Sequence, residues 1–144
     1  MLKQTVEYTN LEGVKVETDL YFNISKIELL EIGLDTFVER IKKMSQEQNA
    51  LGILKELKEF VHIAYGEKSD DGKRFVKSID ILERFKASPA YDEFLFGLAT
   101  DVQKSVAFVN GLFPDEYLED IKARIDSANK SNAEHAELIK KTAL

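Results

Sequence analysis

The chain has no cysteine, only two prolines and no apolar run that approaches the roughly 20 residues of a membrane helix. The lack of cysteine excludes disulfides and thiolate metal sites, and it suits a reducing compartment such as a cytoplasm. The polar start at residues 1–5 lacks the apolar region of a secretory signal. We therefore expect a soluble intracellular protein that has no membrane partner.

An excess of positive charge is also missing. The chain carries 26 acidic and 20 basic residues, a net charge of −6, and no dense lysine or arginine cluster reverses that sign locally. Such a surface repels phosphate backbones, so nucleic acid is not an expected partner. With 144 residues, 44% of them hydrophobic, the chain can form a single domain that buries a real core.

The N-terminal segment has the pattern of a β-hairpin, at about residues 3–22. Residues 5–8 and 14–22 alternate between apolar and polar side chains, and residues 10–13 supply turn chemistry between them. An isolated two-stranded hairpin is marginally stable in water. We expect it to lie on the helices or to pair with another chain. One face of the second strand should be covered, and its members are Val14, Val16, Leu20 and Phe22.

Helical spacing dominates the rest of the chain, which predicts a mainly α fold, a bundle of about six helices with the N-terminal β-hairpin. The segment from Tyr65 to Phe75 reads as a polar loop between two packed helices. Whether Phe75 to Lys77 is extended or helical is open at this point. The expected N-terminal signals of the helices are Asn23 or Ser25, Asp35, Asn49, Ser78, Pro89 at the first helical position, and Thr100 or Asp101.

Two regions are expected along the chain. Residues 1–126 should form a single helical domain that includes the hairpin. Residues 127–144 are rich in alanine and asparagine and offer little apolar surface to bury, so we expect a polar C-terminal extension that is exposed or partly disordered.

No residue pattern predicts a catalytic, cofactor or metal site. The glycine-bounded loop at residues 66–73 lacks the spacing of a phosphate-binding loop. Asp70 and Asp71 lack the alternating ligands of a calcium loop and read as a solvated turn. His62 lies among apolar residues, His135 lies in the polar tail, and neither has a ligand or base partner at useful spacing.

Aromatic residues crowd the stretch 85–113, and core packing is their default role. Phe94, Leu95 and Phe96 are consecutive, however, and consecutive residues of a helix point in different directions. Some of these aromatic and apolar side chains should therefore form an exposed patch that binds a partner. The acidic run at residues 115–120 is explained by the helix dipole, and a docking surface for a basic partner is its alternative. The predicted partner-binding residues are Phe94, Leu95, Phe96, Phe108 and Phe113.

Several segments, in a consistent order over about residues 20–114, resemble one known family. They are Leu20–Leu29, Tyr65–Lys68, Asp71–Ser78, Phe85, Ser88–Tyr91 and Ala107–Pro114. The resemblance is to the tail assembly chaperones of long-tailed phages and prophages, small proteins made beside the tape measure protein.

That resemblance implies a non-enzymatic protein of the host bacterial cytoplasm that coats the tape measure protein and keeps it soluble while tail tube subunits polymerise around it. The implied partners are the tape measure protein and the tail tube subunit. The unpaired hairpin edges, with Tyr8 and Tyr21 adding apolar surface, also predict a homo-oligomer. A structural virion or adaptor subunit is the alternative function, and an enzyme is the least supported class because no nucleophile, base and orienting residue can be named together.

Overall fold

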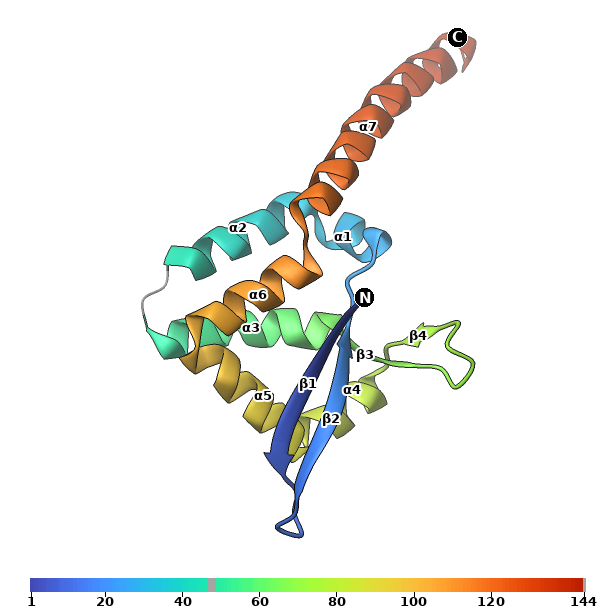
Figure 1. Cartoon of the computed structure of the whole chain (residues 1–144). Coiled ribbons are helices and arrows are strands. Elements are labelled where there is room, and N and C mark those ends of the chain that lie inside the picture. Colours follow the sequence, from blue (N-terminus) through green and yellow to red (C-terminus); the bar gives the residue numbers. More distant parts are fainter. Residues whose placement is uncertain (47–48, 144) are drawn as a thin grey trace. The chain divides into compact units, whose positions relative to one another are not determined.

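The structure is a computed structural model that describes residues 1–46 and 49–143. The chain divides into two units, Met1–Leu112 and Phe113–Leu144. The described part of the first unit contains four strands and six helices, which Figure 1 labels in chain order. Their bounds are β1 Leu2–Thr9, β2 Lys15–Phe22, α1 Lys26–Ile32, α2 Leu34–Gln46, α3 Ala50–Ala64, β3 Tyr65–Lys68, β4 Phe75–Val76, α4 Ile79–Lys86, α5 Pro89–Thr100 and α6 Val102–Leu112.

The predicted N-terminal hairpin is confirmed. β1 and β2 pair antiparallel along their whole length, from Leu2 opposite Phe22 to Thr9 opposite Lys15. The side chain of Asn10 closes the turn by accepting hydrogen bonds from two backbone N–H groups, and Gly13 follows with φ +82°, which glycine adopts at low cost. The alternation places Leu20 and Phe22 in the core and the charged residues of β2 on the solvent face. The expectation that Val14 shares the covered face was wrong, because Val14 lies before β2 in the turn region and is 54% exposed.

The hairpin extends into a four-stranded sheet of order β1-β2-β3-β4, which the sequence did not predict. Tyr65 to Phe75 is therefore a β-hairpin, and its prediction as a plain loop between helices was wrong. Phe75 and Val76 are extended. A Cβ atom added at Gly66 would lie 2.7 Å from the Phe75 ring and 2.8 Å from the Val76 carbonyl oxygen, so only glycine lets β3 and β4 approach this closely.

Most of the helix starts follow the predicted signals. Ser25 forms a complete capping box with Glu28 at the start of α1, and Gly33 ends that helix with φ 100°. Two of the predicted N-cap residues do not cap a helix. Asn23 donates its backbone N–H to the Ala64 carbonyl instead of capping a helix, and Asp35 lies inside the first turn of α2, which already begins at Leu34. The predicted caps Asn49, Ser78 and Asp101 are confirmed, and so is Pro89 at the start of α5. Ser88 caps α5, which the sequence analysis did not predict.

The core of the first unit is an aromatic cluster that joins the sheet to the helices. Phe22 of β2 is fully buried at its centre. Its ring lies 5.1 Å from those of Phe94 and Phe108 and 5.7 Å from that of Tyr65. Phe85 of α4 stacks on Tyr65 at 3.8 Å. Because aromatic rings combine large buried area with preferred edge and stacked geometries, this cluster fixes α4, α5 and α6 against the hairpin.

The second unit consists of one helix, α7, from Asp115 to Ala143. Its first half carries apolar residues at helical spacing, among them Tyr117, Leu118 and Ile121, and Arg124 pairs with Asp120 at 3.3 Å. The helix continues through residues 127–143, so the expected boundary at residue 126 falls inside α7. The division of the chain into a domain of 126 residues and an extension stays a prediction.

Candidate partner-binding surface

The five predicted partner-binding residues lie in different environments. Phe94 and Leu95 on α5 and Phe108 on α6 are buried, whereas Phe96 is 65% exposed. Phe113 comes directly after α6 and is the first residue of the second unit. The structure brings Phe94 and Phe108 together in the core, with ring centroids 5.6 Å apart. That the five contact a partner stays a prediction, and Phe96 is the one among the four in the first unit whose side chain is open to solvent.

Phe96 borders a small depression of about 220 Å³ between α3 and α5, whose other walls include Leu54, Tyr91 and Ala99. The exposed ring follows from its place on α5. Phe94, Leu95 and Leu98 already take the buried positions of that helix, and Phe96 points about 100° away from Leu95. A large aromatic side chain at such a position adds apolar surface that water covers in the free protein.

A more continuous apolar surface lies between α2, α3 and α6. It is a groove of about 300 Å³, which we call the α2–α3–α6 groove. Apolar side chains dominate its walls, while Ser105 and Asn110 supply the few polar atoms. Its apolar members are Ile41, Met44, Ile53, Val102, Val106 and Val109.

The valines of α6 explain why this groove stays open. Val102 and Val106 are one helical turn apart, so they lie on the same face, and they are 65% and 52% exposed. Phe108 and Leu112 occupy the buried side of the same helix, and Val109 is a buried residue that lines the groove together with the two exposed valines. α6 therefore carries one wide band of apolar residues, and the part of the band that holds Val102 and Val106 is not packed.

Ion pairs join α2 to α3 beside the groove. Lys43 Nζ lies 3.1 Å from the Glu56 carboxylate, and Arg40 pairs with Glu59 at 3.3 Å. Glu56 is only 8% exposed although it is charged. The pair of Arg40 with Glu59 is about half exposed and contributes about 0–1 kcal/mol. Both pairs link α2 to α3 across their polar margin.

The polar clusters singled out in the sequence act as structural parts. Asp71 accepts hydrogen bonds from the Ser69 hydroxyl at 2.6 Å and from the Lys73 backbone at 3.0 Å, and Gly72 turns the chain with φ +72°. The hydrogen bonds from Ser69 and Lys73 lower the pKa of Asp71. Within the described residues, no group of three or more metal-ligating side chains converges.

His62 is held by an aromatic partner. Its Nε2 atom is 2.7 Å from the Tyr91 hydroxyl, and the two rings stack at 5.7 Å. Burial lowers the pKa of His62, and the charges of Lys86 and Lys58 lower it further. The pair links α3 to α5, and Tyr91 also lines the Phe96 depression, so the pair positions these two helices beside it.

Comparison with known proteins decides the family. A family model described as phage tail assembly chaperone matches residues 1–143. The chain belongs to the phage tail assembly chaperone family. The match confirms the resemblance noted in the sequence and extends it to both ends. Neither the curated proteins nor the solved structures that were compared give a match to this chaperone. Among its described residues, none of the helices is both long and apolar enough to cross a membrane.

Proposed function

We propose that this chaperone binds the tape measure protein and keeps it soluble in the host cytoplasm, and that the α2–α3–α6 groove receives a helical segment of that client. Membership of the tail assembly chaperone family supports the role. The single observation that carries the site is the groove itself, an apolar channel bounded by helices, which is the shape that accepts the apolar face of an amphipathic helix. Shielding a client in this way requires no catalytic group.

The expected gain from covering the groove can be estimated from its two most exposed residues. Fully burying a valine or leucine side chain is worth about 1.5–3 kcal/mol. Val102 and Val106 still have more than half of their surface in water. Covering both therefore contributes about 2 kcal/mol, which is a change of roughly thirtyfold in affinity. Contacts with Ile41, Met44 and Ile53 add to this and define the direction of the bound helix.

Co-expression tests the proposal. The tape measure protein encoded with this chaperone should appear in the soluble fraction when the native chain is present, and should become insoluble with the Val102→Glu/Val106→Glu variant. Both positions are exposed, so the variant should fold. Ile79→Glu is the matched control, because Ile79 is an equally branched residue, 80% exposed on α4 and remote from the groove walls.

Three results would contradict the proposal. If the tape measure protein is equally insoluble with and without the native chaperone, the client is a different one. If the groove variant solubilises it as well as the native chain does, the groove is not the site. Mass spectrometry of purified particles gives the third result, because abundant chaperone in mature virions would favour the structural subunit instead. Binding of tail tube subunits, the other expected partner, stays a prediction that the same co-expression can test.

A further inference from the structure

β1 is a long edge strand with one open side. Among the described residues, the sheet order places β2 beside β1 on one side only. The register over its eight residues is continuous, with no bulge, and the strand contains no proline. Natural sheets usually block such edges, because a straight edge with free backbone groups is a template for another strand.

The hydrogen-bond register shows which backbone groups are free. The Asn10 N–H donates to the Val14 carbonyl at 2.8 Å, so the bonded pairs of β1 and β2 fall on even-numbered residues of β1. On the other side of β2, the Asn23 N–H donates to Ala64, which fixes the same phase. The N–H and C=O groups of Lys3, Thr5, Glu7 and Thr9 therefore point away from β2, into the open edge.

There is room beside this edge. A groove of about 320 Å³ runs between β1 and the helices α5 and α6. One wall is the strand itself, from Gln4 to Glu7, and the floor includes Phe94, Leu98 and Ala107. Gly97 faces it without a side chain, and the closest atom to a Cβ built there is Lys104 Nζ at 4.0 Å. An added strand would cover apolar surface that the sheet leaves at its margin.

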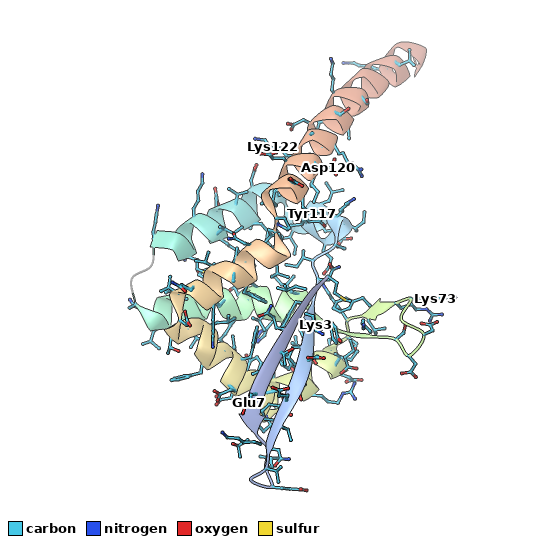
Figure 2. All side chains as sticks on the ribbon, viewed as in Figure 1. Lys3, Glu7, Lys73, Tyr117, Asp120 and Lys122 are labelled. Carbon is cyan, nitrogen blue, oxygen red and sulfur yellow. The ribbon has the colours of Figure 1, made fainter. Side chains whose placement is uncertain are left out.

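The charges on β1 identify the occupant. On the solvent face, Lys3 and Glu7 lie two residues to either side of Thr5, and Figure 2 shows both on β1. If a second β1 pairs antiparallel with Thr5 opposite Thr5, each Lys3 falls opposite the Glu7 of the other copy. Lys3, Thr5 and Glu7 are also odd-numbered residues, whose backbone groups point into the open edge. The register that pairs the charges is therefore also one that forms the backbone hydrogen bonds.

One unfavourable feature of the single chain fits the same arrangement. Glu7 lies directly opposite Glu17 in the hairpin, and like charges at such positions destabilise a sheet. Lys15 approaches Glu7 only to 3.9 Å, with both side chains largely exposed. A lysine from a second copy beside Glu7 would place a positive charge in that row.

We propose that this chaperone forms a symmetric dimer in which β1 pairs antiparallel with β1 of a second copy, centred on Thr5. In each protomer the backbone N–H groups of Lys3, Thr5 and Glu7 donate hydrogen bonds to the other copy, and their carbonyl groups accept them. Two ion pairs between Lys3 and Glu7 fix the register. The inner face brings Val6 of one copy opposite Gln4 of the other. The dimer does not depend on the identity of the client, because its surface is separate from the α2–α3–α6 groove.

Charge reversal tests the proposed register of the dimer with two single variants and their mixture. Lys3→Glu alone and Glu7→Lys alone each place like charges opposite one another twice in a homodimer. We expect the dissociation constant of each to rise about 10- to 30-fold at low ionic strength. Mixing the two variants gives a heterodimer in which both pairs are again opposite in charge, so the mixture should regain the native dissociation constant. Sedimentation velocity measures all three.

Controls and contrary results are clear. Both side chains are exposed, so circular dichroism melting should confirm that the variants fold as the native chain does. A native protein that stays monomeric at high micromolar concentration would overturn the dimer and would leave the edge to an extended segment of another protein. Native association that neither variant weakens, or weakened variants that mixing does not restore, would overturn this register.

Backbone hydrogen exchange provides a second test, because it reports on the amides of β1 directly. Association through a different surface would not protect these amides. The amides of Lys3, Thr5 and Glu7 should become protected as the protein concentration rises. Those of Gln4, Val6 and Tyr8, which face β2, should be protected at every concentration. Equal behaviour of the two sets would contradict β1 pairing.

Discussion

Replacing Lys77 with methionine should destabilise the first unit more than any comparable surface change. Lys77 precedes α4, and its Nζ atom donates to both carboxylate oxygens of Glu28 at 2.7 Å and to the Ile63 carbonyl at 2.8 Å. It thereby joins the start of α1 to the end of α3. Methionine keeps most of the apolar stem and removes the three donors.

The magnitude follows from how much water reaches the pair. A hydrogen bond to a charged group is worth about 1.5–3 kcal/mol, and breaking a buried pair costs about 3–5 kcal/mol, whereas exposed pairs contribute about 0–1 kcal/mol. The side chains of Lys77 and Glu28 are 23% and 30% exposed, which is between these limits. We expect Lys77→Met to lower the free energy of unfolding by about 2 kcal/mol.

The effect should fade in acid. Burial alone would raise the pKa of Glu28, but the hydrogen bonds from Lys77 and Ser25 outweigh it and hold that pKa below its ordinary value of 4.5. A carboxylate with a depressed pKa in the folded state stabilises the protein above its unfolded pKa. That contribution is lost as the pH falls through the folded pKa. The difference between native protein and Lys77→Met should therefore be full at neutral pH and shrink below about pH 4.5.

Urea unfolding followed by circular dichroism is the assay. Lys86→Met is the matched control, because Lys86 on α4 pairs with the exposed Glu83 at 3.5 Å, and its loss should cost less than about 0.5 kcal/mol. A double-mutant cycle with Glu28→Gln should give a coupling energy of about 1–2 kcal/mol. The reasoning is refuted if Lys77→Met costs no more than Lys86→Met, or if the two sites show no coupling.

Three further predictions concern the same unit, each measured by chemical or thermal unfolding. Gly66→Ala should destabilise by about 1–3 kcal/mol, because the added methyl group collides with Phe75 and the Val76 carbonyl, and an unchanged melting temperature would contradict the close approach of β3 and β4. Ser25→Ala should cost about 1 kcal/mol through loss of the capping box, while an effect near zero would mean that α1 does not need its cap. Because the pKa of His62 is lowered, its contribution to folding stability is complete above about pH 6.5 and is lost as the pH falls through the folded pKa. His62→Gln should therefore destabilise the protein at neutral pH and less in mild acid. An equal loss of stability at both pH values would contradict this explanation.

Much of the fold could be predicted because local signals agree with the final packing. Alternation in β1 and β2 and the caps Ser25, Asn49 and Ser78 each act within a few residues, and the structure keeps them. β3 and β4 could not be predicted, because strands of four and two residues are too short to show alternation. Their pairing depends on the close approach of Gly66 to Phe75, and such a tertiary contact cannot be read from local sequence patterns.

The site was less predictable for a related reason. Periodicity shows that Val102 and Val106 are apolar and share a helix face, but it does not show whether another element covers that face. Phe94 and Phe108 read as surface candidates because of aromatic crowding, and the structure shows that they pack around Phe22. Residues 127–143 read as polar extension because they bury little, yet alanine, glutamate and lysine favour helix without burial, and α7 continues there.

Site-specific photocrosslinking tests the proposed client site most directly. A photoreactive phenylalanine derivative is placed at position 106 in the α2–α3–α6 groove or at position 79 on α4, and each chain is co-expressed with the tape measure protein. The account predicts a covalent adduct with the tape measure protein from position 106 and none from position 79. Equal crosslinking from both positions, or none from position 106 while the client remains soluble, would contradict it.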